Sequence, residues 1–177
     1  LDRSSAASDV YKRQEGKNKL LAQGYHEIGM DHFALESDAM YQSFQAGTLH
    51  RNFMGYTASK TQVMIGLGIS SISDSWYSFA QNEKKLEDYY ARLENNELPV
   101  YRGHILSAED LMIRRHILNL MCSFQTSWAE PDMQFPELAE VLGHLEEMQD
   151  DGLLEIGPHS IRAVSYTHLT LPTSDLV

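Results

Sequence analysis

A helix, a glycine and a strand are predicted to follow one another in residues 17–30, which read KNKLLAQGYHEIGM. Leu20 and Leu21 are the apolar positions of the helical part, and Gly24 stands where helices commonly end in a left-handed residue. Residues 25–30 form a short strand. The succession is typical of an α/β unit whose earlier members precede it, and a short helix over 38–46 is expected next.

From Ser107 onward the pattern predicts a helical module that ends in a β-hairpin. Ser107 and Asp110 resemble a capping box. Apolar residues then recur at helical spacing, first as Ile113, Ile117, Leu120 and Phe124, and after Pro136 as Leu138, Leu142, Leu145 and Met148. Gly152 ends the second helix, and residues 153–156 and 160–162 form the hairpin. Helices followed by such a wing predict a winged-helix-like module.

The composition fits one domain or two small ones. The 177 residues carry 14 Lys and Arg against 25 Asp and Glu, a formal net charge of −11. This argues against binding nucleic acid or an anionic membrane, because both need clustered cations. No run approaches the roughly 20 apolar residues of a membrane span. One cysteine, Cys122, excludes an intramolecular disulfide and a site of cysteines alone. We expect a cytoplasmic monomer.

The two ends read as additions to a natural sequence. Residues 8–14, SDVYKRQ, are what the DNA tca gat gtg tat aag aga cag encodes, which resembles the end of a common sequencing adaptor. Residues 164–173, VSYTHLTLPT, resemble the complementary strand in another frame. We therefore expect residues 1–14 and 163–177 to be adaptor-derived and to lack packing. Residues 15–162 are then expected to be a piece of a longer protein.

Glycines interrupt an apolar stretch at residues 65–70, IGLGIS. Glycine there costs backbone entropy, so it usually marks a close backbone approach or a turn with positive φ. Gly66 and Gly68 lack the third glycine of a dinucleotide-binding fingerprint. We expect this backbone to lie flat against a ligand or another strand. A polar helix over residues 83–95 follows, before Pro99.

Two groups of polar residues are candidates for chemistry. Asp31 and His32 follow the predicted strand, where α/β folds direct residues at ligands, so they can act as an acid–base or orienting pair. The alternative is that His32 hydrogen-bonds locally and Asp31 caps the next turn. His50, Arg51 and Asn52 can hold carboxylates, and Arg51 suits a bidentate grip. The alternative there is a solvated loop.

Other conspicuous residues are expected to be structural. Arg114, Arg115 and His116 would suit nucleic acid only with an excess of cations that the chain lacks. Cys122 is expected to be a buried, inert thiol. Four methionines are expected to fill the core: Met54, Met112, Met121 and Met148.

Three ordered blocks carry a resemblance to a known family. They are residues 28–34 (IGMDHFA), 49–57 (LHRNFMGYT) and 66–73 (GLGISSIS). Shorter matches follow at residues 77–82 (YSFAQN), 101–103 (YRG) and 113–115 (IRR). Together they resemble the carboxy-terminal half of oxygen-independent coproporphyrinogen III oxidases, over about residues 20–162.

The resemblance implies a radical S-adenosylmethionine enzyme of heme synthesis. The family oxidatively decarboxylates two propionates of coproporphyrinogen III to vinyl groups, which gives protoporphyrinogen IX. Its cofactors are S-adenosyl-L-methionine and a 4Fe-4S cluster, which a Cys-x3-Cys-x2-Cys motif holds in an amino-terminal barrel. This chain lacks the motif, so the resemblance implies a fragment that is inactive alone, because a single cysteine cannot hold the cluster. The electron acceptor is left open.

The residues carried over from the family are cofactor-binding ones, with no catalytic residue and no metal ligand. Ile72, in the Gly-x-Gly-x-Ser-x-Ile-Ser segment, takes the place of an isoleucine beside a second S-adenosylmethionine. Phe53, in the Arg-Asn-Phe-x-Gly-Tyr block, lines the same region. Met54 stands where many members have glutamine, so a thioether replaces an amide.

The resemblance also completes the expected fold, which is α+β and mainly helical. Residues 15–48 would end a radical-SAM α/β barrel, and residues 49–106 would connect it at the active-site side. Residues 107–162 would form the winged-helix-like C-terminal helical domain.

Two other functions stay open. One is the related heme chaperone, a tetrapyrrole-binding protein without decarboxylase activity, although its corresponding segments resemble this chain less. The other is a separate winged-helix interaction module over residues 107–162.

Overall fold

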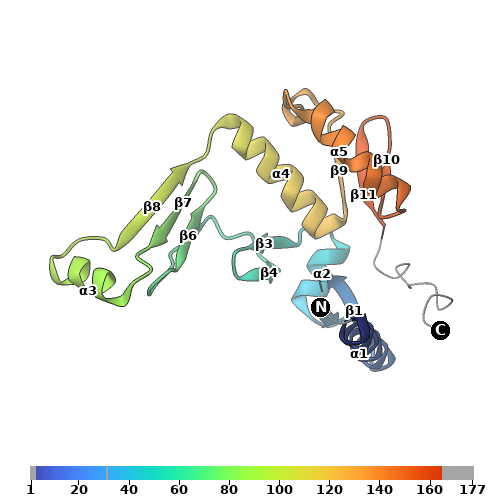
Figure 1. Cartoon of the computed structure of the whole chain (residues 1–177), viewed down its shortest axis with the longest axis horizontal. Coiled ribbons are helices and arrows are strands. Elements are labelled where there is room, and N and C mark those ends of the chain that lie inside the picture. The colour runs from blue at the N-terminus through green and yellow to red at the C-terminus, as the bar shows by residue number, and fades with distance from the viewer. Residues whose placement is uncertain (1–2, 31, 165–177) are drawn as a thin grey trace. The chain divides into compact units, whose positions relative to one another are not determined.

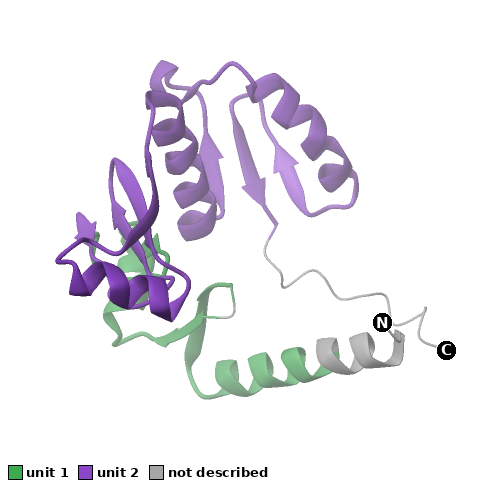
Figure 2. Cartoon of the chain, turned by 60° about the vertical axis from the view of Figure 1, so that its left-hand side comes forward, with its two compact units in different colours: residues 1–60 green, residues 61–177 purple. Residues whose placement is uncertain are grey.

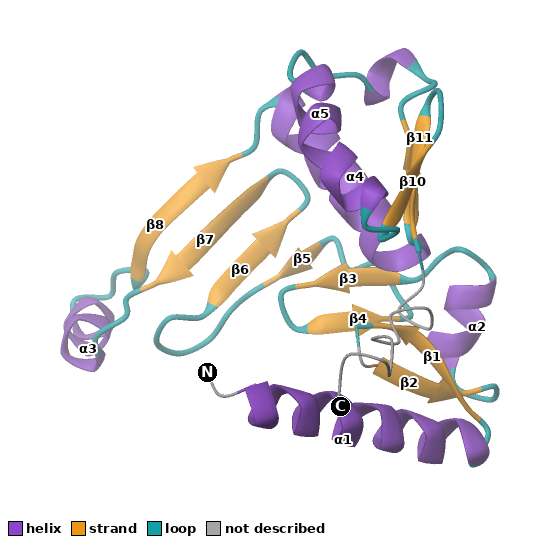
Figure 3. Ribbon diagram, turned by 45° about the vertical axis from the view of Figure 1, so that its right-hand side comes forward, coloured by secondary structure: helices purple, strands orange, loops and turns teal. Residues whose placement is uncertain are grey.

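The chain combines helices with strands that pair antiparallel, so the α+β class is confirmed (Figures 1 and 3). The computed structural model describes residues 3–30 and 32–164, and of residues 3–10 the backbone alone. The chain forms two compact units, residues 1–60 and 61–177 (Figure 2).

The first unit pairs short hairpins with helices. Its elements are α1 (Arg3–Ala22), β1 (Tyr25–Gly29), β2 (His32–Leu35), α2 (Ala39–Gln45), β3 (His50–Asn52) and β4 (Gly55–Thr57). Its core is small and consists of Ile28, which is fully buried, with Ala34 and Leu49.

Helix α1 begins at Arg3, so the backbone of residues 3–14 is helical, while the side chains of residues 11–14 are exposed, in agreement with the expected lack of packing. The segment holds good helix formers and has no glycine or proline before Gly16, so intrinsic propensity favours a helix without an apolar face. Tyr11 is exposed. Gly24, with φ 82°, follows the helix as predicted.

In the C-terminal segment 163–177, the first two residues form hydrogen bonds with the rest of the module. Ala163 closes β11 (Ser160–Ala163), and the Val164 N–H donates to the Leu153 carbonyl oxygen at 2.9 Å, so the expected lack of packing is wrong for this pair. The rest of the tail lies outside the described residues. The adaptor origin of both ends stays a prediction.

Strand β1 forms where it was predicted, but its partner differs from an α/β unit. It pairs antiparallel with β2, which places Tyr25 opposite Leu35. Gly29, with φ 142°, and Met30, with φ 38°, reverse the chain directly after β1, which a parallel crossover would not do. Within the described residues this sheet has two strands, so the predicted barrel strand is here one arm of a hairpin.

Helix α2 confirms the predicted helix over 38–46. The Asp38 side chain accepts a hydrogen bond from the Met40 backbone N–H at 2.7 Å, which caps the first turn. Gly47, with φ 68°, stands just past the helix end.

A four-stranded antiparallel meander opens the second unit (Figure 3). Its strands are β5 (Val63–Met64), β6 (Ile72–Ser75), β7 (Ser78–Asn82) and β8 (Val100–Ile105), in that order across the sheet. Helix α3 (Leu86–Glu94) connects β7 to β8 and lies inside the helix predicted over 83–95.

The rest of the second unit is the predicted helical module with its hairpin. Its elements are α4 (Ala108–Ser123), β9 (Gln125–Ser127), the 3-10 turn η1 (Pro131–Met133), α5 (Leu138–Asp150), β10 (Leu154–Ile156) and β11. The capping box of Ser107 and Asp110 is confirmed. Sequence reasoning missed β9, the outer strand of a sheet ordered β10-β11-β9. Trp128, Leu154 and Ile161 form the buried core.

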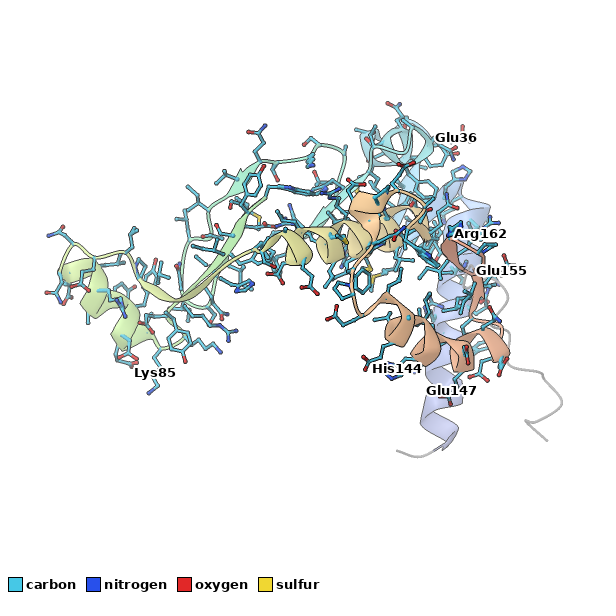
Figure 4. All side chains as sticks on the ribbon, turned by 90° about the horizontal axis from the view of Figure 1, so that it is seen from above. Glu36, Lys85, His144, Glu147, Glu155 and Arg162 are labelled. Carbon is cyan, nitrogen blue, oxygen red and sulfur yellow. The ribbon has the colours of Figure 1, made fainter. Side chains whose placement is uncertain are left out.

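Two apolar positions of this module differ from expectation. Phe124 takes a left-handed conformation, φ 59°, and ends α4 instead of extending its stripe. Met148 is 47% exposed, so it is no core filler. On the outer surface Glu155 and Arg162 stand opposite each other on β10 and β11 (Figure 4).

Candidate functional site

Phe53 and Met54 form the tip of the β3–β4 hairpin in the first unit. Asn52 lies opposite Gly55 in the register, and the Asn52 side chain accepts a hydrogen bond from the Met54 backbone N–H at 2.8 Å. This turn leaves Phe53 54% and Met54 85% exposed. The expectation that Met54 fills the core is therefore wrong, because a two-residue turn directs its side chain outward. Both residues offer an apolar surface to a ligand.

Behind the tip, Arg51 lies against an aromatic ring of the facing strand. Its guanidinium carbon is 4.7 Å from the centre of the Tyr56 ring, and Arg51 and Tyr56 are directly paired in the register. The centre of the His32 ring lies 5.0 Å from the centre of the Tyr56 ring, in an edge-to-face arrangement. His50 is buried. The alternative of a solvated loop at residues 50–52 is therefore wrong, because these residues form a strand.

His32 hydrogen-bonds locally, as its structural alternative supposed. Its Nδ1 lies 2.9 Å from the Met30 carbonyl oxygen. The other half of the proposed pair, Asp31, lies outside the described residues. The acid–base hypothesis for the pair therefore stays a prediction.

Ile72 begins β6 in the second unit and is half-buried. Gly66 lies against its backbone, since a Cβ on Gly66 would be 2.8 Å from the Ile72 carbonyl oxygen. The close backbone approach that the glycines predicted is confirmed at Gly66, and its partner is the backbone of Ile72 at the start of β6. Phe53 and Met54 thus share one hairpin, and Ile72 belongs to the other unit.

A set of hydrogen bonds holds this glycine segment in place. The Asn82 side-chain amide donates to the carbonyl oxygens of Gly66 at 3.0 Å and Gly68 at 2.9 Å. The Gly66 N–H donates to the Ser73 hydroxyl at 3.0 Å, and the Gly68 N–H donates to the Tyr89 hydroxyl at 3.3 Å. Sequence reasoning missed Asn82, whose only signal was its place in the YSFAQN block.

Side chains that alternate along residues 63–69 are apolar and exposed. Their exposed fractions are 63% for Val63, 73% for Ile65, 84% for Leu67 and 45% for Ile69. Contiguous exposed apolar surfaces usually mark binding places, and four exposed apolar side chains on one short segment make it a candidate for one.

Arg114 joins the helical module to the meander within the second unit. Its Nη2 donates to the Asp74 carboxylate at 2.8 Å, and its Nη1 donates to the Ser75 carbonyl oxygen at 2.9 Å. The guanidinium carbon also lies 4.8 Å from the centre of the Trp76 ring. Arg114 is therefore structural, as expected.

Arg115 and His116 are engaged as well. Arg115 pairs with Asp132 at 2.8 Å. The two ring nitrogens of buried His116 lie 2.8 Å from the Thr126 hydroxyl and 2.8 Å from the Met133 carbonyl oxygen. These partners bear out the expectation that the Arg-Arg-His run is structural.

Two carboxylates at the start of α4 have shifted pKa values. The pKa of Asp110 is lowered, first by the Ser107 backbone N–H, then by the Ser107 hydroxyl and by His104. The pKa of Glu109 is raised, because Glu137 shares a hydrogen bond with it and adds a second negative charge. Both groups are on the surface, and the shift of the Asp110 pKa follows from its place in the capping box.

The described residues give no metal centre. No three His, Cys, Asp or Glu side chains converge within residues 3–30 and 32–164. Cys122, the only cysteine of the chain, is half-buried instead of buried. No helix in the described part is long and apolar enough to cross a membrane.

Comparison with known proteins gives consistent relatives. The chain is 33% identical over 169 residues to the oxygen-independent coproporphyrinogen III oxidase of Pseudomonas aeruginosa, which covers 93% of this chain and 37% of the relative. It is 42% identical over 126 residues to the enzyme of that name from Paracoccus denitrificans, covering 69% of this chain and 28% of the relative. No family model matches the chain.

A solved structure agrees with these relatives. Coproporphyrinogen III oxidase (HemN) from Escherichia coli, described as a radical SAM enzyme, matches with a TM-score of 0.77 and 33% identity. The match covers 85% of this chain and 36% of that one. The chain thus spans about a third of the length of the proteins that it matches.

Proposed function

The chain belongs, over the part that it spans, to the oxygen-independent coproporphyrinogen III oxidase family, and on this premise we propose that it is the carboxy-terminal part of such an enzyme. The whole enzyme would oxidatively decarboxylate coproporphyrinogen III to protoporphyrinogen IX in heme synthesis. The observation that carries this proposal is the structural match, at 33% identity, over 85% of the chain.

We propose that this part of the enzyme contributes to binding S-adenosyl-L-methionine. Phe53 and Met54 would pack on a cofactor from the exposed hairpin tip of the first unit. Ile72, at the start of β6 in the second unit, stays a separate proposal that rests on the family resemblance. Exposed apolar side chains fit this role, because adenine and a sulfonium both bind well against apolar and polarisable surfaces. The thioether of Met54 would pack on the ligand without the polar contact of an amide.

The 4Fe-4S cluster does not fit the residues present. A cluster of this kind is held by several cysteine thiolates, and the chain has only Cys122. We therefore derive no chemical step from this part alone. The cluster would belong to the part of the relatives that the chain does not span.

Two architectural assignments belong to the same proposal. Residues 15–48 would complete a radical-SAM barrel. Residues 107–162 would form a winged-helix-like domain, which the order helix, strand, helix, hairpin supports. The exposed apolar residues 63–69 fit a chain whose relatives are much longer. A cytoplasmic location and a monomeric state are proposed with them.

The test uses the natural gene. Its DNA upstream of the codon for Glu15 should encode the Cys-x3-Cys-x2-Cys motif, and the encoded protein should convert coproporphyrinogen III without oxygen when S-adenosyl-L-methionine and a reductant are supplied. Heme titration is run in parallel. Tight heme binding without turnover would favour the heme chaperone instead, and a missing cysteine motif would contradict the enzyme assignment.

A further inference from the structure

Arg51 carries a positive charge that no described acidic side chain neutralises. Its Nη1 is buried and has no hydrogen-bond partner within the described residues. An arginine stays protonated in proteins, so the guanidinium cannot avoid the desolvation penalty of burial by losing its charge. A buried donor without an acceptor is costly, and a charged one more so.

Three acidic residues of the first unit are engaged with partners other than Arg51. Glu27 pairs with Lys17, and Glu36 pairs with His26. Asp38 caps α2. Within the described residues no carboxylate accepts a hydrogen bond from the buried Nη1 of Arg51.

The guanidinium is nevertheless held in one place. Its plane is supported by the Tyr56 ring at 4.7 Å, and Tyr56 is in turn contacted by His32. Arg51 as a whole is only half-buried, although its Nη1 is buried. A guanidinium fixed by stacking on a ring is already arranged for a planar, bidentate acceptor, and it loses little freedom when it binds one.

We propose that Arg51 binds a carboxylate of the ligand, a role that rests on the proposed function and adds a residue to its site. Phe53 and Met54, two and three positions further along the chain, place exposed apolar surface beside the charge. This combination suits a molecule that carries a carboxylate next to an apolar part. Two sources have that chemistry, namely a propionate of the tetrapyrrole and the amino-acid carboxylate of S-adenosyl-L-methionine.

The test compares R51Q, R51K and the control R102Q in the natural full-length protein. Arg102 is an exposed arginine that donates to Gln81 and lies away from the hairpin sequence. Equilibrium dialysis gives the affinity for labelled S-adenosyl-L-methionine, and fluorescence gives the affinity for coproporphyrin III, the stable oxidised tetracarboxylate. Coproporphyrin tetramethyl ester serves as the probe without carboxylates.

R51Q should weaken one of the two carboxylate ligands by about tenfold to a hundredfold, since charge-assisted hydrogen bonds are the strong ones. The affected ligand identifies the source of the carboxylate. R51K should lose less, because it keeps the charge but not the fork. R102Q should change neither affinity, and the ester should bind R51Q and the parent protein equally.

A folded R51Q protein that binds both carboxylate ligands within twofold of the parent would overturn the proposal, because Arg51 would then pair with another part of the protein. If R51Q does not fold, R51K decides in the same way. The proposed function is judged separately. A parent protein that binds these ligands through Arg51 but gives no turnover would contradict the oxidase and leave the role of Arg51 standing.

Discussion

Arg114 and Asp74 form an ion pair in which both side chains are largely enclosed, 13% and 8% exposed. R114A would leave the Asp74 carboxylate buried without its partner. Removing one member of a buried pair costs about 3–5 kcal/mol, so we expect a loss of that order in the free energy of unfolding. Urea denaturation of the 177-residue chain measures it.

The neighbouring arginine is the matched control. Arg115 pairs with Asp132, and these two side chains are 42% and 68% exposed. R115A should cost no more than about 1 kcal/mol, because solvent screens exposed pairs. Equal losses for R114A and R115A would contradict the structural role given to the buried pair.

Asp110 supplies a prediction for the dependence on pH. Since its pKa is lowered in the folded state, its ionised form stabilises the protein above the pKa of the unfolded state. This stabilisation is lost as the pH falls through the lower, folded pKa. In S107A the pKa of Asp110 should rise toward its ordinary value, because the hydroxyl no longer donates to it. An NMR titration of the carboxyl carbon measures this, and an unchanged pKa in S107A would refute the capping account.

Single residues also show where sequence reasoning reaches its limit. Asn82 and Asp74 look like ordinary polar residues of a strand, yet their partners lie 16 and 40 positions away along the chain. No local pattern carries such pairs, because only the folded meander and α4 bring them together. Met54 was misassigned for the related reason that composition does not say which methionines a turn exposes.

At the scale of elements, Gly66 tests the close approach of two strands. In G66A the new Cβ would meet the Ile72 backbone oxygen at 2.8 Å, and a backbone atom cannot swing aside. We expect a loss of about 1–3 kcal/mol in the free energy of unfolding, as for other overpacked positions. Thermal and urea denaturation check it.

A second glycine gives the opposite expectation. Gly143 lies inside α5, and the position that a methyl group would take there has nothing within 4 Å, so G143A should stabilise the helix by about 1 kcal/mol. The two substitutions add the same atoms. If G66A proved as harmless as G143A, the packing of the glycine segment on β6 would be wrong.

Elements with a strong local signal were predictable. The capping box and Gly152 marked the start of α4 and the end of α5 directly. Strand β9, QTS, carries no apolar alternation and forms only because β11 lies beside it. Strand β2 was missed because the order helix, glycine, strand suggested a crossover to a parallel strand. Gly29 and Met30, both with positive φ, instead turn the chain back into a hairpin.

At the scale of the molecule, the family could be inferred from ordered blocks spread over the chain, since each block fixes residue types at set spacings. The site could be inferred only in part. Phe53, Met54 and Ile72 followed from those blocks, and Arg51 was a candidate from its residue type, whereas the unpaired state of its Nη1 is a property of packing that only the structure shows.

The central claim is that this chain is part of an enzyme that removes two carboxyl groups from a tetrapyrrole. The most direct measurement is the mass of the product formed by the natural full-length protein from coproporphyrinogen III, without oxygen and with S-adenosyl-L-methionine present. We predict loss of two carboxyl groups as carbon dioxide and the appearance of two vinyl groups. A folded protein, loaded with its cluster, that returns the tetracarboxylate unchanged would contradict the claim.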